Sequence, residues 1–199
     1  TINCHAGKLP FYRGRNILNW ALINDEKDFG ITVHFVDEGI DTGDIIMQKV
    51  YPITDNDNYK TLLELAYVEC ADILYETIKK IQANKYVTIK QKDIHPVGLY
   101  CGKRTVGDEV IDWNQNARDV FNFIRAICDP GPKATTIMNG QIVRINASNL
   151  ILKAPKYKGK PGQILVKTGQ GYLVKTLDSF IEILEIDSNV KLNVGERFK

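Results

Sequence analysis

The chain lacks several features that would place it in a specialised class of protein. It has 199 residues, of which 44% are hydrophobic, yet it contains no run of about 18 apolar residues that could cross a membrane. It does not start with a basic segment followed by an apolar core, so no signal peptide is predicted. Its four cysteines form no C-x-x-C pair and match no metal-ligand spacing. We therefore expect free thiols, no metal, no membrane contact and a cytoplasmic location.

Acidic residues are missing from one long segment. No Asp or Glu occurs between Asp129 and Asp178. The basic residues of this segment are Lys133, Arg144, Lys153, Lys156, Lys158, Lys160, Lys167 and Lys175. The pattern predicts a basic face that could meet phosphate. A solvated lysine surface is the simpler interpretation, because few aromatic residues stand among them.

Residues 1–82 read as alternating strands and helices. Residues 1–4 end a strand, a helix over 17–24 follows a cap at Asn16, and strands over 30–36 and 45–53 form a hairpin. The strongest helix covers 55–82, with Asp57 or a Thr61–Glu64 capping box at its start. Its expected buried stripe comprises Leu62, Leu65, Ala66, Ile73, Ile78 and Ile81.

The second half has a different pattern. After a connector, residues 116–128 form a helix with Val120, Phe121, Ile124 and Ile127 on one side. Asn139-Gly140 marks a hairpin turn, and three more short strands lie within 161–186. Short strands with glycine-rich turns favour a small barrel. We expect an α/β domain over 1–92, a linker over 93–109, and a helix with a small, mostly β, barrel domain over 110–199.

Asn3, His5 and Asp41 are the candidate catalytic residues. Asn3 and His5 lie two apart on a strand, so their side chains point the same way. A crossover through one helix and one strand is expected to return Asp41 to the sheet beside them, at its carboxyl edge. An amide donor, an imidazole and a carboxylate are what acyl-type transfer to an amine requires. Each residue alone also has a structural interpretation: a turn former, a core histidine and a turn cap.

The segment NCHAGKLPFYRGRNILNWALINDEKDFGITVHFVDEGIDTGDII resembles the catalytic segment of the 10-formyltetrahydrofolate-dependent formyltransferases. That family carries Asn-x-His, a Leu-Pro…Arg-Gly loop, and an Asp-x-Gly that follows a Thr-x-His/Met strand. Asn3, His5 and Asp41 fall on its catalytic positions. The match is strong over residues 1 to about 55 and looser beyond.

The resemblance implies a fold, a cofactor and further site residues. The fold would be the C-terminal half of a Rossmann-like formyltransferase domain followed by an OB-like barrel, and the formyl donor would be 10-formyltetrahydrofolate. The implied cofactor-binding residues are Asp37, Glu38, Gly39 and Ile40. The implied substrate-binding residues are Leu9, Pro10, Tyr12, Arg13, Gly14, Lys103 and Arg104. The chain would also start inside the catalytic domain, so we expect weak or absent activity from these residues alone.

Three functions remain open at this point. The segment GKRTVGDEVIDW and the later IRAICDPGPKA resemble sugar N-formyltransferases, which predicts a nucleotide-linked amino sugar as acceptor. Methionyl-tRNA formyltransferase is the first alternative, with tRNA as partner, because of the acid-free basic segment. A non-catalytic folate- or nucleotide-sugar-binding module is the second. The oligomeric state, with a homodimer among the options, is not determined by the sequence.

Overall fold

The computed structural model describes all residues, 1–199, and divides them into two compact units. The first unit comprises residues 1–21 and 26–105, and the second comprises 22–25 and 106–199. The division after Thr105 falls inside the segment expected to be a linker. None of the helices is both long and apolar enough to cross a membrane.

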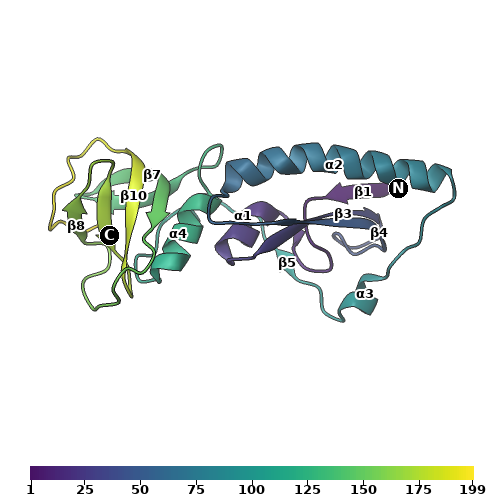
Figure 1. The fold of residues 1–199 in the computed structure, drawn as a ribbon, viewed down its shortest axis with the longest axis horizontal. Coiled ribbons are helices and arrows are strands. Elements are labelled where there is room, and N and C mark those ends of the chain that lie inside the picture. Colours follow the sequence, from purple (N-terminus) through teal and green to yellow (C-terminus); the bar gives the residue numbers. More distant parts are fainter. The chain divides into compact units, whose positions relative to one another are not determined.

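The first unit is built on a three-stranded antiparallel sheet in the order β1-β3-β4 (Figure 1). Its strands are β1 (Ile2–His5), β3 (Asp28–Phe35) and β4 (Ile45–Pro52), with the short β2 (Arg13–Gly14) and β5 (Tyr100–Cys101) pairing in parallel elsewhere. Its helices are α2 (Tyr59–Gln82), α3 (Gln91–Ile94) and the larger part of α1 (Ile17–Ile23), whose last two residues are assigned to the second unit. The expected β3–β4 hairpin is confirmed.

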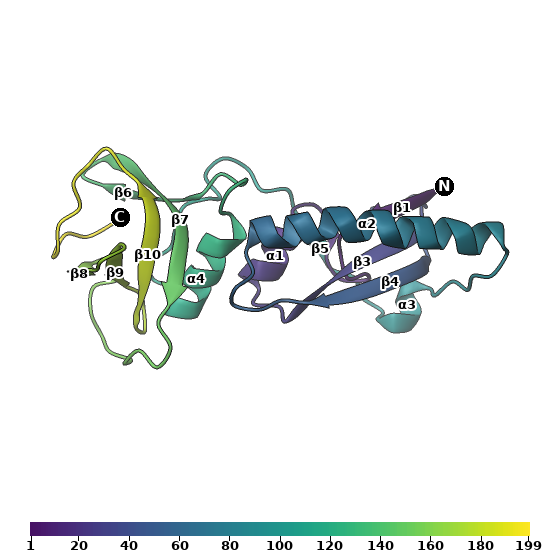
Figure 2. The same ribbon diagram turned by 45° about the horizontal axis from the view of Figure 1, so that its top comes forward.

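The sheet has two chemically different faces because side chains alternate along each strand. Ile31 and Val33 of β3 are fully buried, and α2 packs against β1, β3 and β4 (Figures 1 and 2). The other face is polar: Asn3 pairs in register with His34, and His5 pairs with Thr32. The first unit therefore separates an apolar core under α2 from a polar surface that can hold a site.

The long helix begins later than expected and uses another cap. Asn58 is the N-cap residue, and its side chain accepts from the Thr61 backbone while Thr61 bonds back to the cap, so the capping box is Asn58–Thr61 and not Thr61–Glu64. Leu62, Ala66 and Ile73 are buried as expected, whereas Ile78 is 38% exposed. Asn16 directly precedes α1 as expected, and its carbonyl oxygen accepts from the Trp20 N–H at 3.0 Å, while its side-chain oxygen accepts from the Arg104 N–H at 2.9 Å.

The second unit contains one five-stranded antiparallel sheet in the order β6-β7-β10-β9-β8. Its strands are β6 (Ala134–Met138), β7 (Gln141–Leu150), β8 (Ile164–Lys167), β9 (Tyr172–Lys175) and β10 (Phe180–Asp187). Helix α4 (Ala117–Ala126) packs on β7 and β10 (Figure 2). The apolar side of α4 comprises Val120, Phe121 and Ile124, which are buried as expected, as is Ile127 at the C-cap.

The expected small barrel is not closed, because the edge strands β6 and β8 do not pair directly. The C-terminal segment lies between them instead: Lys199 and Ile137 of β6 exchange backbone hydrogen bonds, while Phe198 donates to Gly162 just before β8. The hairpin turn at Asn139-Gly140 is confirmed, and both residues have positive φ, as this turn type requires.

Candidate active site

The polar face of the first unit brings Asn3, His5 and Asp41 together. Asn3 Nδ2 lies 3.4 Å from Asp41 Oδ1, and His5 Nδ1 lies 3.6 Å from Asp41 Oδ2. The Asn3 side chain is exposed, whereas the side chains of His5 and Asp41 are only 9% and 13% exposed. The cluster is thus open on the Asn3 side and closed behind it.

The route by which Asp41 reaches the site differs from the expected one. We expected a return of the chain to the carboxyl edge of the sheet, but β1 and β3 run antiparallel, and Ile2 pairs with Phe35. The loop after β3 therefore starts beside the amino end of β1, next to Asn3. The three groups meet as predicted, but the reason is an antiparallel neighbour and not a parallel crossover.

His34 belongs to the same cluster, although no role was predicted for it. Its Nε2 lies 3.3 Å from Asn3 Nδ2 and 3.4 Å from Asp41 Oδ1, and the side chain is 3% exposed. Its Nδ1 lies 2.7 Å from the Phe35 carbonyl oxygen, which can only accept, so Nδ1 carries a hydrogen. In a neutral His34, Nε2 then accepts from the Asn3 amide, which fixes the direction of that amide.

The loop after β1 holds the His5 ring. His5 Nε2 lies 2.7 Å from the carbonyl oxygen of Tyr12, so Nε2 donates. A Cβ on Gly7 would lie 2.3 Å from the same nitrogen, so only glycine leaves space for this contact. Both ring nitrogens of His5 face acceptors, since Nδ1 lies 3.6 Å from Asp41 Oδ2 and Nε2 faces the Tyr12 carbonyl oxygen.

The carboxylate of Asp41 is oriented by the backbone of the same loop. The Gly14 N–H donates to Asp41 Oδ2 at 2.9 Å. Asp41 itself has φ of 54°, and Gly14 has φ of 96°, a left-handed conformation in which glycine is favoured. The Leu-Pro…Arg-Gly loop therefore contributes backbone geometry to the site.

Most of the remaining predicted substrate-binding residues are buried or have side-chain partners. Leu9 is 1% exposed, and Pro10 is also buried. The Tyr12 hydroxyl donates to Glu26 at 2.6 Å. The Arg104 guanidinium lies 5.5 Å from the ring centre of Trp20, and the Lys103 side chain is exposed.

The predicted cofactor-binding turn is exposed beside the cluster. Asp37, Glu38, Gly39 and Ile40 are all solvent-exposed. The Thr42 hydroxyl and the Gly39 N–H donate to Asp37, and the Thr42 bond is the main cause that lowers the pKa of the Asp37 carboxyl. The turn is therefore ordered by its own side chains, with Ile40 59% exposed at its tip.

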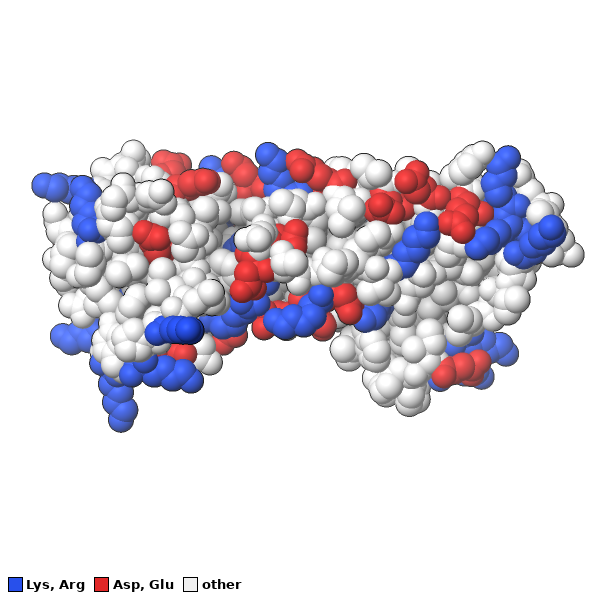
Figure 3. All heavy atoms as spheres, viewed as in Figure 1, with Lys and Arg blue, Asp and Glu red and all other residues white.

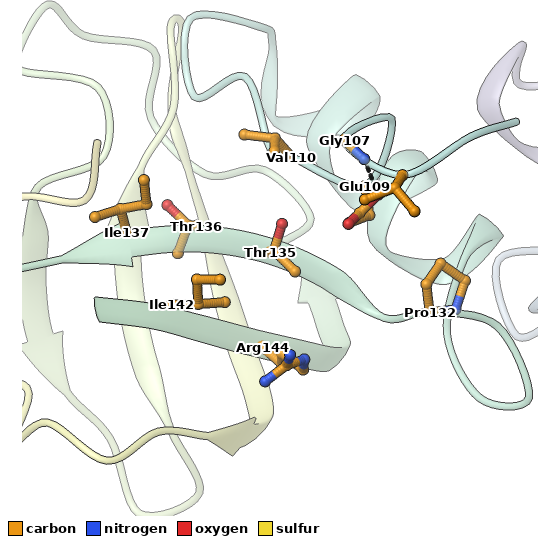
Figure 4. A pocket seen from close by; sticks show the side chains of 10 residues that line it. Gly107, Glu109, Val110, Pro132, Thr135, Thr136, Ile137, Ile142 and Arg144 are labelled. Atoms are coloured by element: carbon orange, nitrogen blue, oxygen red, sulfur yellow. Dashed lines mark hydrogen bonds between the residues drawn. The ribbon is translucent and has the colours of Figure 1, made fainter. Parts of the chain in front are cut away.

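A separate pocket lies in the second unit (Figure 4). It has a volume of about 340 Å³ and is lined by Val106, Gly107, Glu109, Val110, Pro132, Thr135, Thr136, Ile137, Ile142 and Arg144. The carboxylate of Glu109 accepts from the Gly107 N–H at 2.7 Å, the contact drawn as a dashed line. None of the predicted site residues lines it.

A carboxamide, an imidazole and a carboxylate on the open polar face of a sheet define a candidate acyl-transfer site. Residues 1–77 match the formyl transferase family, and residues 103–196 match the formyl transferase C-terminal domain. The chain belongs to the formyl transferase family. The predicted resemblance to formyltransferases is confirmed, and the choice between the sugar and tRNA types is not decided by these matches.

Similar curated proteins include methionyl-tRNA formyltransferases of several bacteria. That of Pelotomaculum thermopropionicum is 36% identical over 183 residues, covering 88% of this chain and 57% of the relative. That of Thermodesulfovibrio yellowstonii is 35% identical, covering 96% of this chain and 59% of the relative. The chain therefore spans about three fifths of the length of such relatives.

Solved structures of sugar formyltransferases share the fold. WlaRD, a sugar 3N-formyltransferase, is 27% identical with a TM-score of 0.74, covering 96% of this chain and 66% of that one. The N-formyltransferase of Helicobacter canadensis is 24% identical with a TM-score of 0.76, covering 94% of this chain and 66% of that one. The second likeness shows the fold alone.

Proposed function

We propose that this chain forms part of an N-formyltransferase that moves a formyl group from 10-formyltetrahydrofolate to a primary amine. The observation that carries the proposal is the convergence of Asn3, His5 and Asp41 within hydrogen-bonding or ion-pair distance on one polar face. The family match supports the same reaction class.

The geometry supports a direct attack of the amine nitrogen on the formyl carbon, which forms the new C–N bond. Negative charge then develops on the formyl oxygen, and the exposed Asn3 amide can donate to it. Asn3 Nδ2 carries two hydrogens that face His34 Nε2 at 3.3 Å and Asp41 Oδ1 at 3.4 Å, so donation to the formyl oxygen requires one of these two contacts to be given up. A donor of this kind is worth about 2.7–4 kcal/mol. The tetrahedral intermediate then collapses, the bond from this carbon to the folate nitrogen that carried the formyl group breaks, and tetrahydrofolate leaves as that nitrogen takes up a proton.

His5 and Asp41 would handle the proton. Asp41 accepts the amine proton, directly or through water, and its Oδ2 faces His5 Nδ1 at 3.6 Å. In this structure His5 Nε2 is bonded to the Tyr12 carbonyl. Donation from that nitrogen to the oxyanion therefore requires it to leave this carbonyl.

Methionyl-tRNA is the acceptor that the curated relatives favour. The relatives with 30–36% identity to this chain carry that name. The acid-free segment adds a second reason, because its basic side chains from Lys153 to Lys167 are exposed and could contact phosphate. Figure 3 shows Lys and Arg side chains at the surface of the second unit, at the left of the view. Lys175 does not contribute to this face, since it is fully buried.

A nucleotide-linked amino sugar is the second candidate acceptor. WlaRD, whose structure was determined with dTDP and 5-N-formyltetrahydrofolate, matches the fold over nearly the whole chain. The resemblance of residues 102–113 to sugar N-formyltransferases favours the same class.

One competition assay tests the proposal and separates the acceptors. The whole enzyme of which this chain forms part is incubated with 10-formyltetrahydrofolate carrying a ¹³C-formyl group, and with methionyl-tRNA, uncharged tRNA or a panel of dTDP- and UDP-amino sugars. A gain of one ¹³C carbonyl on methionyl-tRNA, with a rate that falls steeply as salt rises, supports the first acceptor. A gain only on a sugar amine supports the second. No gain on any primary amine contradicts the proposed reaction.

A further inference from the structure

Gln91 occupies a position that the reaction above leaves unexplained. Gln91 is the first residue of α3 and lies in a segment that the sequence predicts to be only a connector. It is nevertheless only 3% exposed. Just before Gln91, this segment is attached to the sheet, because Ile89 and Ile45 of β4 exchange backbone hydrogen bonds at 2.8 and 2.9 Å. Gln91 is thereby inserted behind the Asp41 loop.

The hydrogen bonds of Gln91 fix its amide without ambiguity. Its Oε1 accepts from Arg13 Nε at 3.0 Å and from Arg13 Nη2 at 2.6 Å, and a guanidinium can only donate. Its Nε2 donates to the carbonyl oxygens of Asp41 and Gly43, both at 2.8 Å, and a carbonyl can only accept. A flipped amide would lose all four bonds.

These bonds close a ring through the two loops of the site. The Arg13 guanidinium binds Gln91, Gln91 binds the Asp41 backbone, and the Asp41 carboxylate binds the backbone N–H of Gly14, the residue after Arg13. Gly98 leaves space for this ring, because a Cβ there would lie 2.3 Å from Arg13 Cζ.

Asp41 needs such support because its backbone is in an unfavourable conformation. A φ of 54° is uncommon for a residue with a side chain and persists where the surroundings hold it. Its carboxylate follows its backbone, so a shift of the loop moves the group that faces His5 and His34. A displacement of about 1 Å in a catalytic group can cost on the order of 10²-fold in rate.

We propose that Gln91 is a positioning residue that, together with the Arg13 guanidinium, sets the location of Asp41 relative to His5 and His34. This inference rests on the proposed function for its effect on rate, but not for its structural readout. It also assigns Arg13 to the support of the site, in place of a direct contact with substrate.

The test uses Gln91→Glu, which keeps the shape and the acceptor for Arg13 but replaces both N–H donors by an oxygen facing two carbonyls. The ring ¹⁵N resonances of the three histidines are recorded in the 199-residue chain, with His95 assigned through His95→Gln. We expect the His5 and His34 signals to shift. Thr77→Ala is the matched control, because it removes a buried hydroxyl bonded to Ile73 on the opposite side of the sheet, and it should leave both signals in place.

Where formyl transfer is measured, we expect Gln91→Glu to lower kcat on the order of 10²-fold with little change in the KM of the folate. Gly98→Ala should give the same pattern, since it displaces Arg13 without altering either partner. Unchanged His5 and His34 resonances in both variants would overturn the proposal, as would a loss of kcat no greater than that of Thr77→Ala at equal loss of stability. The histidine resonances test the positioning role of Gln91 even if no formyl transfer is found. Failure of this proposal can therefore be distinguished from failure of the proposed function.

Discussion

Replacing Asp41 by Asn removes one charge from the site while keeping its shape, and the contacts predict the result. Asp41 Oδ2 accepts from the Gly14 N–H at 2.9 Å, so the new amide must place its oxygen there. Its NH₂ group then faces Asn3 Nδ2, where the carboxylate had accepted at 3.4 Å, and two donors oppose each other. In the opposite orientation, the NH₂ group faces the Gly14 N–H. This contact between two donors is more unfavourable because the distance is shorter, 2.9 Å instead of 3.4 Å.

The size of the expected loss in kcat follows from losing the general base and the hydrogen bonds to a charged carboxylate. Loss of the general base costs about 10²–10⁴ in rate, or about 2.7–5.5 kcal/mol of activation free energy. Hydrogen bonds to a charged group contribute about 1.5–3 kcal/mol each, so some stability is lost as well. We expect Asp41→Asn to lower kcat within that range, measured by steady-state formyl transfer relative to the unsubstituted protein. Asp72→Asn, an exposed site on α2, is the control for charge removal. A kcat for Asp41→Asn within threefold of the control would refute the reasoning.

Three further predictions concern other parts of the chain. Gly7→Ala should lower kcat about 10²-fold, since the added Cβ would lie 2.3 Å from His5 Nε2; normal steady-state kinetics would contradict this. Cys70 should react with iodoacetamide faster than Cys4 at pH 8, measured by peptide mapping with mass spectrometry. The hydrogen bond between the two side chains lowers the pKa of the Cys70 thiol, whereas the same bond and burial raise the pKa of the Cys4 thiol. Cys4→Ala removes this bond and should slow the reaction of Cys70. Lys175→Met should cost about 2–4 kcal/mol in urea denaturation, because a fully buried ammonium that donates to three carbonyls at 2.7, 3.1 and 3.3 Å is lost; unchanged stability would show that these carbonyls find other donors.

Much of the local structure could be predicted because it depends on neighbours in the sequence. The period of two placed Asn3 and His5 on one face, and the Asn139-Gly140 pair marked its hairpin because both residues adopt positive φ. The first residue of α2 was harder to predict from the sequence, because Asp57, Asn58 and Thr61 can all cap a helix and only the backbone geometry selects one of them.

The remaining parts of the site depend on contacts between distant segments, which no local pattern encodes. His34 sits in a strand of β-branched and aromatic residues, and its approach to Asn3 follows from the register of β1 and β3. Gln91 reaches Asp41 from 50 residues away in a polar connector. Lys175 reads as one more surface lysine, yet the turn after β9 surrounds it with carbonyl oxygens.

The central claim is that Asn3, His5 and Asp41 act as one catalytic unit in formyl transfer. The most direct measurement is the rate of ¹³C-formyl transfer for the three single alanine variants and for the triple variant. The effects of substituting groups that work together are strongly non-additive. We therefore expect each single variant to lose most of its turnover and the triple variant to be little slower than the slowest single variant. Losses that multiply, or near-normal transfer by any single variant, would contradict it.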